Sequence, residues 1–306
     1  MNPKFTLTKR HNVPVIEFTE RVKVGDTVTI LAQADEHWDN VHTNQELIAI
    51  HMQEAVDLGW PIIKLGDQLC LMQGKTDGRA SKADLRPEHK TGNYIDAVVN
   101  GYAKFCEFAA PNIALIAEGN HEAAVRSRME TNVVERVAER WRVAGSSVHA
   151  GGIGGWLLVR LKITSTQRIL VPIFYHHGHG GGGLSRGIQH VNKRALYLPD
   201  AQVIISGHVH EEYTMTLCRD RINLHTGRTF ADEQIAVCTA TYKDEYDPEG
   251  SSWHSLQGRP PKPIGASWLE LSLRREFDDR LAPPRKGKEK QKLPRFYVTV
   301  NVRRAK

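Results

Sequence analysis

The sequence has little cysteine, no long apolar run and no export signal. Its four cysteines, Cys70, Cys106, Cys218 and Cys238, form no CxxC pair and no dense framework, which argues against a disulfide scaffold. No apolar run approaches the roughly 18 residues that a membrane helix needs. The N-terminal segment lacks the apolar core of a secretory signal. We therefore expect a cytoplasmic protein with free thiols and no membrane partner.

Excess positive charge is also missing from most of the chain. The formal net charge is +6, but residues 282–306 alone carry nine basic side chains and one acid, which leaves about −2 for the rest. The body therefore offers no broad basic groove for duplex DNA. The tail is interpreted as a solvated basic linker before a strand, with nucleic-acid contact as the alternative.

The apolar pattern indicates an α/β protein. With 306 residues the chain is long enough for one large α/β domain with a substantial core. Val28–Ala34 and Pro61–Leu65 are short apolar runs typical of buried strands. Between them, the capping-box spacing of residues 43–46 opens an amphipathic stretch to about Leu58. Strand, helix and strand in this order predict a parallel βαβ unit.

The predicted helix places its apolar face on Leu47, Ile50 and Ala55. A third strand is predicted at Asn112–Ala117, followed by one long helix to about Trp141.

Beyond Gly151 the pattern changes to strands. Six are predicted, at Trp156–Ile163, Ile169–Tyr175, Val203–Ser206, Tyr213–Cys218, Ile235–Ala240 and Phe296–Val302. We interpret residues 1–281 as one catalytic domain with a motif core at about 28–215, and residues 282–306 as the basic linker and C-terminal strand.

Five polar clusters share one position, because each follows the carboxyl end of a predicted strand. They are Asp35-Glu-His37, Gly66-Asp67, Gly119-Asn-His-Glu122, His176-His177-Gly178 and Gly207-His-Val-His210. In open α/β sheets, sites form at these strand ends, so five separate segments can converge on one crevice. On an extended strand end, residues i and i+2 point the same way, so both ends of Asp-x-His and His-x-His can reach one cavity.

The donor set consists of carboxylates, imidazoles and one amide oxygen. Such ligands suit divalent ions such as Mn²⁺, Fe²⁺ or Zn²⁺ better than a structural thiolate site. The sequence therefore predicts a metal centre built from these clusters.

In this order the clusters resemble the signature of the calcineurin-like metallophosphoesterase superfamily: Asp-x-His, Gly-Asp, Gly-Asn-His-Asp/Glu, a His before Gly, and Gly-His-x-His. Residues 151–156 (GGIGGW), the glycine-rich loop after His176, and Arg186-Gly187 are similar to those of members encoded by phages and prophages. The resemblance implies a four-layer α/β/β/α sandwich of two mixed sheets flanked by helices. It also implies that the protein is located in the cytoplasm of a bacterial host.

The resemblance further implies the roles of the site residues. Two divalent ions would be held, most often Mn²⁺, with Fe²⁺, Zn²⁺ or Ni²⁺ as alternatives. The first ion would be bound by Asp35, His37, Asp67 and His210, and the second by Asp67 as the bridge together with Asn120, His177 and His208.

The remaining histidines are given roles at the substrate. His121 would contact the phosphate and assist the leaving group as the catalytic residue. His177 is assigned as the ligand because it directly precedes Gly178, although the doublet leaves His176 open. His176, His179 and Arg186 are candidates for the substrate side of the site.

The resemblance implies hydrolysis of a phosphoester by a bridging hydroxide. We favour a phosphodiesterase acting on nucleic acid, either DNA or RNA, or on nucleotides, without an obligate protein partner. The alternatives are a phosphomonoesterase, including a protein phosphatase, and a non-catalytic module that binds metal or nucleic acid.

Overall fold

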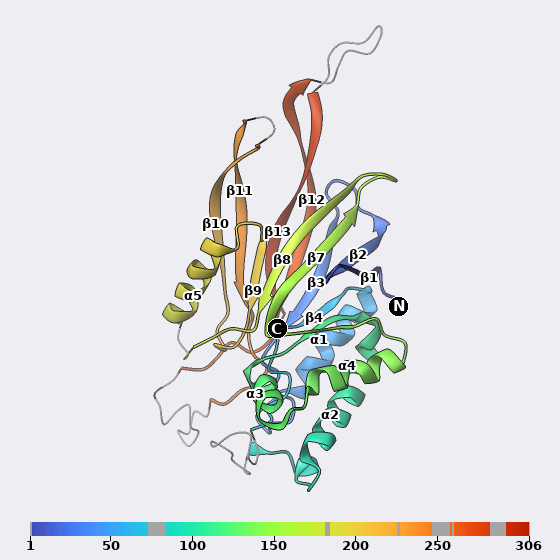
Figure 1. The fold of residues 1–306 in the computed structure, drawn as a ribbon, viewed down its shortest axis with the longest axis vertical. Coiled ribbons are helices and arrows are strands. Elements are labelled where there is room, and N and C mark those ends of the chain that lie inside the picture. Colours follow the sequence, from blue (N-terminus) through green and yellow to red (C-terminus); the bar gives the residue numbers. More distant parts are fainter. Residues whose placement is uncertain are drawn as a thin grey trace.

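The chain folds into two mixed β-sheets that carry helices on their outer faces (Figure 1). The computed structural model describes residues 2–72, 84–180, 184–224, 227–246, 258, 260–281 and 292–305. The seven-stranded sheet has the order β1 (Phe5–Arg10), β2 (Val13–Arg21), β7 (Gly154–Lys162), β8 (Arg168–His176), β9 (Val203–Ser206), β11 (Thr229–Cys238) and β10 (Tyr213–Ile222). The six-stranded sheet has the order β13 (Lys292–Ala305), β12 (Ala266–Leu281), β3 (Thr27–Gln33), β4 (Ile62–Lys64), β5 (Ile113–Ala117) and β6 (His149–Gly151).

Both sheets combine parallel and antiparallel pairs. Strands β3, β4, β5 and β6 run parallel to one another, whereas β12 and β13 form a long antiparallel hairpin, of which β12 pairs antiparallel with β3. The predicted strand at Phe296–Val302 is part of this hairpin. The predicted linker before it falls largely outside the described residues, and the proposed division of the chain at residue 281 stays a prediction.

Three apolar clusters separate the layers. The cluster between the two sheets is fully buried and includes Ile16, Ile30, Ile63, Leu115, Leu157, Ile173, Val203 and Leu269. A second cluster lies between the six-stranded sheet and the helices α1 (Gln45–Leu58), α2 (Tyr94–Phe105) and α4 (Val133–Val143). A small third cluster beside α5 (Leu184–Tyr197) lies against β8 and β9 of the other sheet. The predicted four-layer α/β/β/α sandwich is therefore confirmed.

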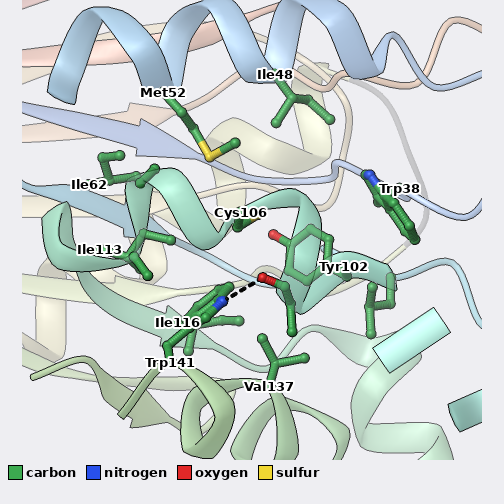
Figure 2. Close-up of a cluster of buried hydrophobic side chains, with 14 of the residues drawn as sticks. Trp38, Ile48, Met52, Ile62, Tyr102, Cys106, Ile113, Ile116, Val137 and Trp141 are labelled. Atoms are coloured by element: carbon green, nitrogen blue, oxygen red, sulfur yellow. Dashed lines mark hydrogen bonds between the residues drawn. The ribbon is translucent and has the colours of Figure 1, made fainter. Parts of the chain in front are cut away.

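The helix-side cluster is shown in Figure 2, where Trp141 of α4 lies close to Tyr102 of α2. The Trp141 side chain is 1% exposed, and its Nε1 donates a hydrogen bond of 2.9 Å to the carbonyl of Ala103. Its ring centroid is 6.2 Å from that of Tyr102. Trp141 thus fastens α4 to α2 by both packing and a hydrogen bond.

Replacing Trp141 with alanine is expected to lower the free energy of unfolding by about 3–5 kcal/mol, because it opens a large cavity and leaves the Ala103 carbonyl without its donor. Urea denaturation measures this change. Trp141→Phe keeps most of the ring and should cost clearly less than the alanine variant. Equal losses in both variants would show that packing area is not what matters at this position.

The structure corrects several expectations about helices. Helix α1 is capped by Asn44, whose Oδ1 accepts from the backbone N–H of Leu47 at 2.9 Å, and not by Thr43. Its buried face contains Ile48, Met52 and Ala55, while Ile50 is 52% exposed, so the predicted face was wrong in part.

The single long helix predicted after the third strand is also wrong. It is divided into α3 (Asn120–Met129) and α4, because Glu130 adopts a left-handed conformation with φ of 53° and Asn132 caps the next helix. Strands β1, β2, β6 and β12, and helix α5, were not predicted at all. Among the described residues, no helix has both the length and the apolar character needed to cross a membrane.

Candidate metal centre

The candidate metal centre lies at the carboxyl ends of five strands, β3, β4 and β5 of one sheet and β8 and β9 of the other. Asp35 and His37 follow β3, Asp67 follows β4, Asn120 and His121 follow β5, His177 follows β8, and His208 and His210 follow β9. Strands β3, β4 and β5 are parallel to one another, and so are β8 and β9. Both sheets therefore deliver their loops to a shared site.

Asp35, His37 and His210 form a first group of possible ligands. The Nε2 atoms of His37 and His210 are 3.3 Å apart, and Oδ1 of Asp35 lies 3.5 Å from Nε2 of His210. Asp35 is fully buried, and its Oδ2 accepts the backbone N–H of His208 at 2.7 Å. Its Oδ1 has no hydrogen-bond partner in the described part of the chain. A buried carboxylate oxygen without a hydrogen-bond partner is costly, and a cation at this point would satisfy it.

Asp67, His177 and His208 form a second group, with Asn120 beside them. Nε2 of His177 lies 3.1 Å from Oδ2 of Asp67 and 3.1 Å from Oδ1 of Asn120. The same corner of the Asn120 amide is 2.7 Å from Nδ1 of His208 and 3.2 Å from Oδ2 of Asp67. Lone-pair atoms of three side chains thus converge on one amide corner. With the amide oxygen facing this corner, the donor set fits a divalent ion.

Hydrogen bonds to backbone carbonyls set the imidazole tautomers of this group. Nδ1 of His177 lies 3.0 Å from the carbonyl oxygen of Leu65, and Nε2 of His208 lies 2.9 Å from that of Gly180. Carbonyl oxygens only accept, so these two nitrogens carry the hydrogens. In the neutral rings the opposite nitrogens therefore present lone pairs to the site, which is the orientation that metal-ligating histidines need.

The two groups are neighbours. Nε2 of His177 in the second group lies 3.9 Å from Oδ1 of Asp35 in the first. Burial alone would lower the pKa of His177, but the Asp67 carboxylate, with Asp35, raises it to about 10. Burial opposes the charge on Asp67 as well, yet attraction to His177 and His121 holds the pKa of Asp67 well below its usual value. In the metal-free site a proton on His177 thus occupies the place where a cation would bind, and the two would compete.

The backbone around the ligands is unusual. Five of the seven predicted ligands have a left-handed conformation with φ between 46° and 74°: Asp35, His37, Asp67, His208 and His210. The expectation that Asp-x-His and His-x-His act from extended backbone is therefore wrong, since each strand has ended before its ligands begin. Residues in this region are strained, and such strain concentrates at functional sites.

Two motif glycines leave room for ligands from other strands. A Cβ on Gly119 would lie 2.0 Å from Oδ1 of Asp67, and a Cβ on Gly207 would lie 2.5 Å from Oδ2 of Asp35. Neither position can carry a larger side chain without displacing a buried carboxylate.

Gly207→Ala is therefore expected to weaken metal binding by roughly 10–100-fold, since the Asp35 carboxylate must move. Titration calorimetry with Mn²⁺ measures the change. Gly92→Ala is the matched control, because a Cβ at Gly92 would meet no atom within 4 Å, and this variant should bind the metal normally. Gly25→Ala is less suitable, because Gly25 has a positive φ. An unchanged affinity in Gly207→Ala would contradict the close packing of the two loops.

Glu122 ties two of the ligand loops together. Its buried carboxylate accepts backbone N–H groups from Gly119 at 2.9 Å, Asp67 at 3.1 Å and Leu69 at 3.0 Å. Burial, reinforced by the charge of Asp67, raises the pKa of Glu122 to about 8. Glu122 thus binds backbone N–H groups of the loop after β4 and of the residue before α3, and it holds these two ligand-bearing segments together.

A second buried support lies behind the Asp-x-His loop. Glu36, between the two predicted ligands, forms a fully buried ion pair of 2.5 Å with Nζ of Lys64. The Oγ1 of Thr43 donates to the carbonyl of His37 at 2.7 Å. Neither contact was predicted, because a capping role had been assigned to Thr43 and Lys64 lies within an apolar strand.

His121 lies at the rim of the second group. Its Nε2 is 3.6 Å from Oδ2 of Asp67, and its Nδ1 is 2.5 Å from the carbonyl oxygen of Cys70. Its ring stacks edge-on against His37 with centroids 4.9 Å apart. His121, His37 and Cys70 also lie close enough to form a third possible ligand group. The role of His121 stays a prediction.

The substrate-side candidates are less closely placed. His176 faces away from the two ligand groups, since its Nδ1 contacts the backbone N–H of Gly178 at 3.0 Å and Arg194 of α5 at 3.1 Å. His177, and not His176, therefore faces the carboxylates. His179 is exposed and stacks against His190 of α5 with centroids 5.8 Å apart. Arg186 lies in α5, and its side chain is outside the described part of the chain.

Comparisons with known proteins give distant structural likenesses. A conserved uncharacterised protein from Streptococcus pneumoniae TIGR4, described as a predicted phosphoesterase, is similar over 91% of this chain and 99% of its own, with 11% identity and a TM-score of 0.32. Wild-type Vps29 from Entamoeba histolytica, complexed with Zn²⁺, is similar over 91% of this chain and 100% of its own, with 11% identity and a TM-score of 0.35. No protein-family model and no curated protein matches the chain. At these scores the likenesses carry no argument about function, which depends on the geometry of the site.

Proposed function

We propose that the chain is a metal-dependent phosphoester hydrolase with a dinuclear centre. The observation that carries the proposal is the convergence, from five strand ends, of two buried carboxylates, four buried or half-buried imidazoles and the Asn120 amide in two adjacent groups. Asp35, His37 and His210 would hold one ion and Asn120, His177 and His208 the other. Asp67 would bridge the two.

Two divalent ions held there would supply positive charge to neutralise phosphate oxygens and to activate water for in-line attack at phosphorus. The side chains would complement this chemistry. Asn120 contributes a neutral ligand, which limits the negative charge facing an anionic substrate. His121, at the rim, would donate a proton from Nε2 to the departing oxygen, a role that suits imidazole near neutral pH. Mn²⁺ is our first choice of metal, with Fe²⁺, Zn²⁺ and Ni²⁺ as alternatives.

For the substrate we propose a phosphodiester in DNA, RNA or a nucleotide. The support is the resemblance to phage-type proteins and the basic composition of residues 282–306. Two arginines of β13 are less available to bind a nucleic acid, because Arg295 pairs with Glu276 at 3.1 Å and Arg303 pairs with Glu270 at 3.0 Å.

The basic residues between Pro284 and Gln291 are therefore the ones to substitute. Glutamine in place of Arg285, Lys286, Lys288 and Lys290 should weaken binding of a single-stranded oligonucleotide and flatten its salt dependence. An unchanged salt dependence would remove the tail from the substrate site.

The deciding experiment compares bis(p-nitrophenyl) phosphate with p-nitrophenyl phosphate, after metal removal and after addition of Mn²⁺. Hydrolysis of the diester that depends on Mn²⁺ supports the proposal. Faster hydrolysis of the monoester would favour a phosphomonoesterase or protein phosphatase. Turnover that survives complete metal removal would overturn the dinuclear centre. Metal binding without turnover would favour a non-catalytic binding module.

A further inference from the structure

We propose that Asp39 is a positioning residue for His121 and that it acts through the backbone of Cys70. This inference rests on the proposed function, in which His121 assists the leaving group. Asp39 belongs to none of the possible ligand groups and was not among the predicted site residues. Its carboxylate nevertheless determines where the hydrogen-bond partner of His121 lies.

Asp39 is a buried acceptor for three donors. It is 1% exposed. Its Oδ1 accepts the backbone N–H of Cys70 at 2.5 Å, and its Oδ2 accepts the N–H of Leu71 at 3.1 Å and the hydroxyl of Tyr94 at 2.5 Å. These contacts hold two successive peptide units in one orientation.

The peptide that Asp39 holds is strained. Leu71 has φ of 50°, a left-handed conformation that non-glycine residues rarely adopt. Such a conformation persists only when the surroundings enforce it, and the Asp39 carboxylate binds the N–H groups on both sides of the Cys70 carbonyl. Asp39 therefore fixes the direction of that carbonyl.

The Cys70 carbonyl in turn orients His121. A carbonyl only accepts, so the 2.5 Å contact requires a hydrogen on Nδ1 of His121 and leaves Nε2 as the nitrogen that faces the site. When the P–O bond breaks, Nε2 gives its proton to the leaving oxygen, and the imidazole becomes neutral with its hydrogen on Nδ1. The Cys70 carbonyl accepts the hydrogen of Nδ1 both in the imidazolium before the transfer and in the neutral ring after it.

Glu122 can be compared with Asp39, because its carboxylate also binds backbone N–H groups of the loop that contains Asp67 and Cys70. It binds the N–H groups of Asp67 and Gly119, next to predicted ligands. Asp39 binds the other end of the same loop, on the His121 side. Loss of Asp39 should therefore affect proton transfer, whereas loss of Glu122 should affect metal binding.

The test uses Asp39→Asn and a series of diesters whose leaving groups range from p-nitrophenolate to an alkoxide. An alkoxide needs the proton far more than p-nitrophenolate does. We expect kcat to fall about tenfold or more with the alkoxide and less than about threefold with p-nitrophenolate, at an unchanged content of bound Mn²⁺. An equal loss with every leaving group, or loss of the metal, would overturn the assignment.

Two further variants separate positioning from general loosening of the fold. Trp141→Phe lowers stability at a distance from the site and should leave the dependence on the leaving group as in the wild type. In a His121→Ala background, Asp39→Asn should change kcat by less than about twofold, because its effect passes through His121. Additive losses in the double variant would contradict the proposal.

A spectroscopic measurement tests the same point without turnover. Long-range ¹H–¹⁵N correlation of the metal-free protein, with His121 assigned by its absence in His121→Ala, should show the hydrogen on Nδ1 in the wild type. Asp39→Asn should shift this tautomer equilibrium towards Nε2. A neutral wild-type ring with its hydrogen on Nε2 and none on Nδ1 would overturn the inference. If the wild type hydrolyses no phosphoester but shows the Nδ1 tautomer, the proposed function fails and the orienting contact stands.

Discussion

Asp67→Asn is expected to give a protein that folds but loses its metal and nearly all activity. Asp67 is buried, and its Oδ2 is the carboxylate oxygen closest to His177 and faces His121 as well. An amide at this position removes a negative charge and places an N–H among lone pairs, which repels a cation. We expect metal affinity to fall by more than about 100-fold and turnover by at least about 10³-fold, since the proposed ions would supply several kcal/mol of transition-state stabilisation.

Metal analysis after dialysis, together with kcat for the diester, measures both effects. Glu118→Gln provides a matched control, because Glu118 is a buried carboxylate at the end of β5 that pairs with Arg126 at 2.9 Å and belongs to none of the ligand groups. That variant should keep its metal. Asp67→Asn with two ions bound at normal affinity would show that Asp67 is not a ligand.

The sequence was informative where function and local structure coincide. Each ligand cluster begins directly after an apolar strand, so the strand ends of β3, β4, β5, β8 and β9 could be located from hydrophobic runs. Parallel strands then bring these ends together. The four-layer architecture was implied by the family resemblance, and the three apolar clusters confirm it.

The sequence was less informative where backbone geometry decides. No residue pattern predicts that Asp35 and His210 adopt left-handed backbone, because such a conformation depends on contacts with distant segments, such as the one between Asp35 Oδ2 and the N–H of His208. Helix α5 was missed because it begins directly after the glycine-rich loop, whose composition predicts irregular structure. The predicted face of α1 was wrong in part because period alone does not say which side meets the sheet.

The connection from Asp39 to His121 could not have been predicted from the sequence. It joins three separate segments, and its middle member is a backbone carbonyl, which is the same atom whatever side chain Cys70 carries. Only the three-dimensional contacts show it. The same holds for Glu122, which sits in the motif itself but acts on the backbone of another loop.

His121→Ala is expected to reduce kcat by about 10²–10⁴-fold while both ions remain bound. His121 stands at the rim of the site, where its Nε2 is 3.6 Å from Asp67 and its Nδ1 is held by Cys70. It can thus reach a leaving oxygen without being needed to hold a cation. The loss should be largest for alkoxide leaving groups, because p-nitrophenolate departs without a proton.

Metal content and the dependence on the leaving group decide between proton donation and metal ligation. Asn or Gln at this position should not restore activity, since neither side chain can release a proton near neutral pH. Retained metal with a selective loss for alkoxides assigns proton donation to His121. Loss of one ion would instead make His121 a ligand, which its closeness to His37 and Cys70 would allow. In that case the Cys70 carbonyl would orient a metal ligand, and Asp39 would support metal binding in the way that Glu122 does.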